Sequence, residues 1–228
     1  MNVGRIIGGH VVPHANKYPW LVRIWNRDPR SGQPARYYPR SLLGRHHPSK
    51  PPTHPGYPGF CGGTLVATRY VITAAHCVEK KEGGKFPYYR EFRPNELTVR
   101  IGDHNLEEDG EENIPPKFVD LTKIIKHPNH NRAEHNGADV YDIAILELAE
   151  AVDLTVYTPA CLARRISGDK FNGKTATAVG WGWIQENPTV IPDIPYEVDL
   201  TVKDSNNIPS ILSASRQDKE AGTCKVRN

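Results

Sequence analysis

Short runs in which hydrophobic and polar positions alternate dominate this chain, and a period of two predicts β-strands. The clearest run is LTVRI at 97–101, where polar Thr98 and Arg100 separate apolar residues. The same alternation predicts strands at 118–125 and 196–202. Branched or apolar runs predict further strands at 18–24, 60–75 (two strands around a turn at 67–69), 142–148 and 174–179. Short strands without intervening helices predict an all-β barrel or sandwich.

Composition supports a folded protein with many turns. The chain has 228 residues, 38% of them hydrophobic, together with 19 Gly and 20 Pro, which disfavour long helices. One helical turn is expected at 74–81. The net charge of +3 is too small to indicate a nucleic-acid-binding protein. The sequence contains no run of 18 apolar residues, so no membrane span is predicted.

Charge is concentrated in two segments. Residues 26–59 contain six Lys or Arg, one Asp and eight Pro, whereas 102–113 contain six Asp or Glu and no Lys or Arg. Such blocks favour surface loops over core. The basic segment is either a binding surface for an acidic partner or a solvated loop, and the sequence leaves both interpretations open.

Five sequence strings occur in a fixed order: IIGG (6–9) directly after Arg5, CGGTL (61–65), TAAHC (73–77), DIAIL (142–146) and GWG (180–182). Together they strongly resemble the trypsin- and chymotrypsin-like serine proteases, over residues 5 to about 202. The resemblance implies an all-β fold of two Greek-key β-barrels with the active site in the cleft between them.

The resemblance also suggests a division of the chain. Residues 1–5 correspond to a remnant of an activation peptide and residues 6–228 to the protease domain. Within that domain the N-terminal barrel spans about 6–126, a crossover about 127–160, and the C-terminal barrel about 161–228. Insertions at 26–59 and 79–96 lengthen the first half, so we expect the second barrel to be incomplete.

In the family, the histidine of TAAHC is a general base and the aspartate of DIAIL orients it. The resemblance therefore assigns these roles to His76 and Asp142. A single histidine is more often structural, but the coincidence of the string and its cysteine favours the catalytic role. Asp139 is a nearby competitor that the DIAIL string disfavours. Arg5 followed by Ile6 resembles a zymogen cleavage site, at which cutting would free the amine of Ile6.

The nucleophile of the family is the serine of a GDSGG string, and no such string occurs here. None of the eight serines lies in GDSGG or GxSxG, and alignment at Cys224 places Asn228 at the serine position. We expect the chain to be truncated at both ends and inactive by itself, although its family hydrolyses peptide bonds through an acyl-enzyme. The alternatives are a non-catalytic homologue that binds partners in a protease cascade, or a truncated gene model.

The cysteines bear on the cellular compartment in which the protein resides. The resemblance implies a disulfide between Cys61 and Cys77, and the alternative is two buried free thiols. The pairing of Cys161 and Cys224 stays open. A disulfide and the family together predict a secreted protein, although the sequence shows no signal peptide.

The acidic stretch 101–113 resembles the calcium loop of some family members. Side chains of Asp103 and Glu112, with backbone oxygens of Asn105 and Glu108, form the expected ligand set. A solvated acidic turn is the alternative. No cofactor is required by the family mechanism, and the expected partners are polypeptide substrates or protease inhibitors.

Overall fold

The computed structural model describes residues 6–27, 61–81, 89–106, 114–135, 138–163, 171–182, 184, 192–204 and 212–215. Apart from two short 3₁₀ turns, the regular secondary structure of this part of the chain consists of β-strands, as the alternation predicts. The elements are β1 (His10–Val11), β2 (Leu21–Asn26), β3 (Cys61–Ala67), β4 (Tyr70–Thr73), η2 (Ala75–Val78), β5 (Glu79–Lys81), β6 (Tyr89–Glu91), η3 (Pro94–Glu96), β7 (Leu97–Ile101), β8 (Lys117–Lys126), β9 (Asn131–His135), β10 (Ala138–Val140), β11 (Ala144–Leu148), β12 (Thr175–Gly180), β13 (Tyr196–Asp204) and β14 (Leu212–Ser215). Among the described residues, no helix has the length and apolar character needed to cross a membrane.

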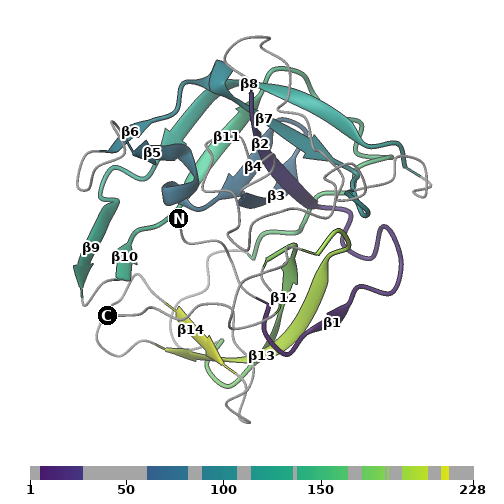
Figure 1. Ribbon diagram of the computed structural model, residues 1–228, viewed down its shortest axis with the longest axis vertical. Helices are drawn as coiled ribbons and strands as arrows, with labels where there is room; N and C mark the ends of the chain where they lie inside the picture. Colours follow the sequence, from purple (N-terminus) through teal and green to yellow (C-terminus); the bar gives the residue numbers. More distant parts are fainter. Residues whose placement is uncertain are drawn as a thin grey trace, which may run out of the picture.

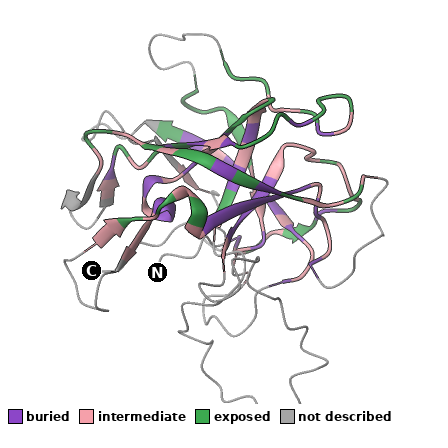
Figure 2. Ribbon diagram, turned by 90° about the horizontal axis from the view of Figure 1, so that it is seen from above, coloured by how far each residue is buried: buried purple, intermediate pink, exposed green. Residues whose placement is uncertain are grey.

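Six antiparallel strands close into a barrel in the order β11-β4-β3-β2-β7-β8, the upper half of the view in Figure 1. Burial alternates along β8, where Val119 and Leu121 are buried while Asp120 between them is exposed, whereas all five residues of β7 are buried. Figure 2 shows the buried residues concentrated in these strands. The barrel core contains Val22, Ile24, Leu65, Val71, Ala75, Val78, Leu97, Val99, Ile101, Val119, Leu121, Ala144, Leu146, Leu148, Val152 and Tyr157.

Two adjacent glycines of β3 differ in their surroundings. A Cβ added to Gly63 would lie 2.8 Å from Val71 Cγ1 and 3.1 Å from Val22 Cγ2, whereas one added to Gly62 would meet only a backbone oxygen at 3.9 Å. Gly63 is buried and Gly62 is exposed. The CGG string therefore combines one glycine that the core packing requires with one that it does not.

The second β unit is an open sheet among the described residues. β13 pairs with β12 along one side, and with both β1 and β14 along the other. Its buried cluster is small and consists of Ile6, Val198 and Leu200. This sheet occupies the lower half of Figure 1.

The boundary between the two units differs from the sequence expectation in two places. β11 lies in the stretch expected to be a crossover, yet it pairs with β4 and β8 and completes the first barrel. Its residues Ala144, Leu146 and Leu148 alternate inward, which gives it the pattern of a barrel strand. Conversely, β1 and Ile6 come from the N-terminal segment but belong to the second sheet.

Backbone and side-chain contacts join the two units. The indole N–H of Trp181, from the GWG string, donates to the carbonyl of His104 at 3.2 Å. The backbone N–H of Leu106 donates to the carbonyl of Asp193 at 3.0 Å. The loop after β7 is thereby held against the second unit.

Candidate catalytic site

His76 and Asp142 lie 66 residues apart in the sequence and meet because their strands are neighbours. His76 is in η2, directly after β4, and Asp142 lies in the turn between β10 and β11. Ala144 of β11 is paired with Thr73 of β4, so the end of one strand and the start of the other are adjacent. The barrel register therefore brings the two side chains together.

Both carboxylate oxygens of Asp142 form hydrogen bonds with His76. Oδ2 lies 2.7 Å from the imidazole Nδ1, and Oδ1 accepts the backbone N–H of His76 at 2.8 Å. A carboxylate can only accept, so Nδ1 carries the proton and Nε2 of the neutral ring is left as the acceptor. The side chains are 23% and 25% exposed, which leaves the ring accessible at one edge.

The pKa of Asp142 is lowered from its ordinary value. Burial acts to raise this pKa, but the hydrogen bond and the positive charge offered by His76, together with the backbone N–H, outweigh it. Asp142 is therefore ionised at neutral pH, which suits a group that stabilises a protonated imidazole.

Tyr141 sets the direction of Asp142 through an unusual backbone conformation. Its φ is +52°, in the left-handed region that non-glycine residues rarely adopt. The N–H of Ile143 donates back to the carbonyl of Tyr141 at 2.8 Å, which closes a tight turn around Asp142. The Tyr141 ring stacks on His127 with a centroid distance of 4.8 Å and an interplanar angle of 7°. This strained turn is a feature that the sequence analysis missed.

The expected disulfide between Cys61 and Cys77 is present, with a Cα–Cα distance of 6.0 Å. The alternative of two free thiols is therefore wrong. Cys77 Sγ lies 3.5 Å from Nε2 of His76, so the bridge forms one side of the imidazole environment. Cys161 is a free, exposed cysteine.

A third ionisable side chain joins the pair. Asp139, in β10, places a carboxylate oxygen within 4.8 Å of donor atoms of both His76 and Asp142. From the sequence alone, Asp139 is expected only as a competitor of Asp142. Its spacing of three residues from Asp142 was the available signal, but only the β9–β10 hairpin shows that the two face the same imidazole.

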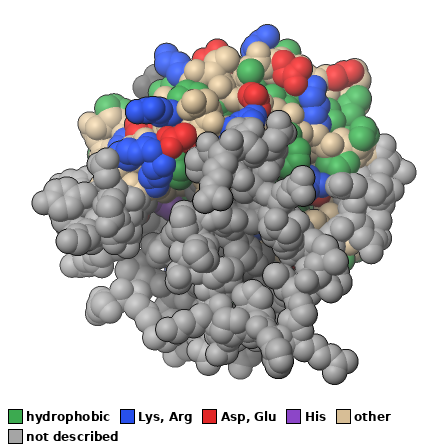
Figure 3. All heavy atoms as spheres, turned by 45° about the horizontal axis from the view of Figure 1, so that its top comes forward, with side chains coloured by type: hydrophobic (Ala, Val, Ile, Leu, Met, Phe, Trp, Pro, Cys, Tyr) green, Lys and Arg blue, Asp and Glu red, His purple; other side chains and the backbone are tan. Residues whose placement is uncertain are grey.

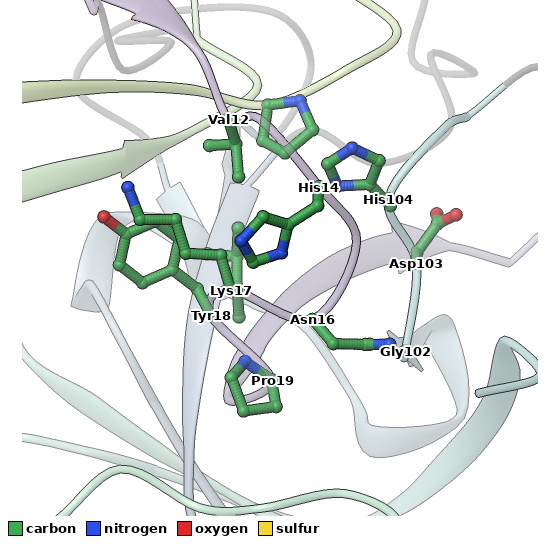
Figure 4. Close-up of a pocket in the computed structure, with 11 residues that line it drawn as sticks. Val12, His14, Asn16, Lys17, Tyr18, Pro19, Gly102, Asp103 and His104 are labelled. Carbon is green, nitrogen blue, oxygen red and sulfur yellow. The ribbon is translucent and has the colours of Figure 1, made fainter. Parts of the chain in front are cut away.

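The acidic stretch fits calcium poorly where it is described. The side chain of Asp103 is 1% exposed and forms an ion pair with Arg100, whose Nε lies 3.1 Å from Oδ2. Its carboxylate is thus occupied by a guanidinium from β7. Figure 4 shows Asp103 beside the small pocket lined by His14 and His104. Asn105 is half-buried.

Several predicted residues lie outside the described part of the chain: Arg5, residues 28–59 of the basic segment, Glu108, Glu112 and Cys224. Ile6, the other half of the predicted cleavage site, is buried against Val198 and Leu200.

Comparison with known proteins identifies the family. The family model described as Trypsin matches residues 46–224, which is most of the chain and includes both His76 and Asp142. The chain belongs to the trypsin family. Four of the five strings, CGGTL, TAAHC, DIAIL and GWG, lie within the matched residues.

Similarity to individual proteases agrees with this family membership, and similarity to a solved structure agrees with the fold. The chain is 37% identical over 128 residues to the human chymotrypsin-like elastase family member 1, covering 56% of this chain and 42% of that protein. It is 27% identical over 212 residues to the serine protease SSP1 of Scolopendra subspinipes, covering 91% of this chain and 58% of that protein. A solved structure described as "Structure of GrC" matches with a TM-score of 0.62 and 23% identity, over 93% of this chain and 76% of that one, and so supports the fold. The matches to the elastases span between two fifths and one half of the relatives' length.

Proposed function

We propose that this chain contributes the general base and the orienting carboxylate of a serine endopeptidase. The observation that carries the proposal is the 2.7 Å contact between Asp142 Oδ2 and His76 Nδ1, which leaves Nε2 of the same ring as a proton acceptor. Membership of the trypsin family supports the same assignment.

In the proposed reaction, Nε2 of His76 takes the proton of a serine hydroxyl as that oxygen attacks the carbonyl carbon of a peptide bond. The imidazolium then gives this proton to the leaving amine, so that an acyl-enzyme remains. Water, activated by the same nitrogen, releases the acyl group. Asp142 stays ionised throughout, fixes the tautomer of the ring and stabilises its positive charge. Only protein groups and water take part.

The nucleophile is proposed to lie outside residues 1–228, because none of the eight serines is in a GDSGG or GxSxG string. A polypeptide of these residues alone is therefore expected to be inactive. Loss of the serine in an analogous triad enzyme lowers turnover by about 10⁶-fold.

The proposal also holds that the protein is secreted, that it is cleaved after Arg5, and that the substrates are polypeptides. The disulfide supports an oxidising compartment. The basic segment at 26–59 is proposed to contact an acidic partner, supported by its six Lys or Arg against one Asp. Calcium is not part of the proposed function, because the carboxylate of Asp103 is paired with Arg100.

The test compares two proteins, the 228-residue polypeptide and the product of the natural transcript read to its stop codon. We expect no labelling of the former by a fluorophosphonate probe. We expect the latter to be labelled and to hydrolyse peptide substrates. Asp142→Asn in the active product should lower kcat by about 10⁴-fold, because the ring takes the wrong tautomer. Asp153→Asn, an exposed carboxylate elsewhere, is the matched control.

Two outcomes would contradict the proposal. Labelling of the 228-residue polypeptide would show that it contains its own nucleophile. A natural product that is secreted and folded but neither labelled nor active would favour the non-catalytic, partner-binding homologue.

A further inference from the structure

A buried histidine, His130, lies between the two segments that carry the candidate base and its carboxylate. It belongs to the turn between β8 and β9, and its side chain is 1% exposed. Its Nδ1 lies 3.3 Å from the carbonyl oxygen of Val140, two residues before Asp142. Its Nε2 lies 3.6 Å from Oε2 of Glu79, three residues after His76. One imidazole ring therefore spans both segments.

Both neighbours of the His130 ring are acceptors, and this determines where its protons lie. A carbonyl only accepts, so Nδ1 carries a proton. In a neutral ring, Nε2 would then hold a buried lone pair that faces the carboxylate of Glu79. Nε2 has no hydrogen-bond partner among the described residues, and its 3.6 Å separation from Glu79 is that of an ion pair rather than a hydrogen bond. Protonation of Nε2 replaces repulsion by attraction.

The other charged groups around this ring are compatible with an imidazolium. The side chain of Glu79 is 8% exposed, and its other oxygen accepts from Lys126 Nζ at 2.6 Å. Burial is the largest influence on the pKa of Asp142 and acts to raise it, whereas the hydrogen bonds and charge of His76 lower it and the positive charge of His130 lowers it further. A charged ring at His130 therefore favours the ionised form of Asp142.

We propose that His130 is a positioning residue of the candidate site. As an imidazolium it joins the carboxylate of Glu79 to the carbonyl of Val140. This link holds the segment after His76 against the turn before Asp142. The effect of His130 on turnover rests on the proposed peptidase function, whereas its charge and its effect on the carboxylate of the pair do not.

NMR of the histidine rings in the 228-residue polypeptide, by long-range ¹H–¹⁵N spectra at pH 7, tests the charge without any assay of activity. We expect both ring nitrogens of His130 to carry protons. Glu79→Gln should remove the Nε2 proton and leave the Nδ1 proton in place. Lys123→Gln, which removes an exposed charge from β8, is the matched control and should leave the ring unchanged. The proposal is overturned if the folded parent chain has an unprotonated nitrogen in this ring.

His130→Phe tests the positioning role, because it keeps a flat ring and removes both N–H donors. The pKa of Asp142, followed by ¹³C NMR of its carboxyl group, should rise in this variant, since a positive charge that favours the ionised form is lost. In the active product, the variant should lower kcat by about 10–100-fold and change KM by less than about twofold, because the base and not the substrate is misplaced. The exposed His14→Gln is the control for both measurements.

The outcomes separate this role from a merely structural one. A folded His130→Phe variant with an unchanged pKa of Asp142, or with unchanged kcat in the active product, would refute the positioning role even if its Tm is lower. An inactive natural product would contradict the peptidase proposal. The NMR measurements on the 228-residue polypeptide would then still decide whether His130 acts on Asp142.

Discussion

At the scale of single residues, Glu197 of β13 is a buried carboxylate outside the candidate site that has several polar partners. Its side chain is 5% exposed, yet its carboxylate lies 2.8 Å from His10 Nε2, and accepts from Lys17 Nζ at 2.6 Å and the Tyr18 hydroxyl at 2.5 Å. In Figure 4 the Lys17 amine and the Tyr18 hydroxyl lie close together, as a shared acceptor requires. A buried carboxylate is tolerated only when it is paired in this way. Glu197 therefore ties the N-terminal segment to the second sheet.

The hydrogen bonds of Glu197 predict how the stability of the folded protein depends on pH. Burial acts to raise the pKa of Glu197, but hydrogen bonds from Lys17, Tyr18 and His10 outweigh it, so the pKa lies below its ordinary value. A lowered pKa in the folded state gives stability that is present above the unfolded pKa of about 4.3 and is lost as the pH falls through the folded pKa. Glu197→Gln should thus lower Tm at pH 7, and the gap to the parent chain should shrink by pH 3.

Thermal unfolding followed by circular dichroism at both pH values measures this gap. Asp199→Asn is the control, because Asp199 lies on the same strand but is exposed. A gap that stays constant between pH 7 and pH 3 would show that the carboxylate charge of Glu197 does not stabilise the fold.

At the scale of elements, the barrel strands pack closely enough to distinguish neighbouring glycines. Gly63 faces the β2 and β4 valines, whereas Gly62 points outward from the same strand. Strand alternation alone explains the difference, since successive residues point to opposite faces.

We predict opposite outcomes for two alanine substitutions. Gly63→Ala places a methyl group 2.8 Å from Val71 Cγ1 and should lower the free energy of unfolding by about 1–3 kcal/mol through overpacking. Gly62→Ala should change it by no more than about 0.5 kcal/mol, because the site is exposed. Urea unfolding of both variants provides the comparison. Equal losses would show that β3 does not pack against β2 and β4 in the way described.

The elements also show what sequence could and could not predict. Strands such as β7 and β8 alternate clearly, so their pattern predicts them. The β9–β10 hairpin has no such alternation, because its residues 131–140 are mostly polar, and it was not predicted. The pairing of His76 with Asp142 was predicted only through family strings. The neighbours of Glu197, up to 187 residues away, follow from strand register, which no local pattern specifies.

At the scale of the whole molecule, two hydrophobic cores of unequal size share one chain. The barrel buries a large cluster, whereas the second sheet buries Ile6, Val198 and Leu200. Charged side chains of both signs are interspersed over the coloured part of the face in Figure 3, so no single-sign field is evident there. Stability should therefore be distributed according to apolar burial, and the second sheet should be the weaker unit.

Hydrogen exchange should reveal this inequality. Amides of β12 and β13 should exchange at a lower free energy of opening than those of β3 and β4. Val198→Ala should speed exchange in the second sheet and leave the barrel amides unchanged. Leu146→Ala, in the barrel, should cost about 2–5 kcal/mol and speed barrel exchange. Loss of protection in both units together, in the Val198→Ala variant, would show a single cooperative core.

The bridge between Cys61 and Cys77 has a further consequence for chemical reactivity. Its Cys77 sulfur lies against the imidazole of His76, so cleavage by a reductant would create a thiol next to a base. Such a neighbour promotes the thiolate form, which is alkylated and oxidised far faster than an isolated cysteine. Because Cys77 is only 4% exposed, in a reducing cell interior this reactivity would serve small oxidants such as peroxide rather than bulky electrophiles, whereas in an oxidising medium the bridged sulfur is inert.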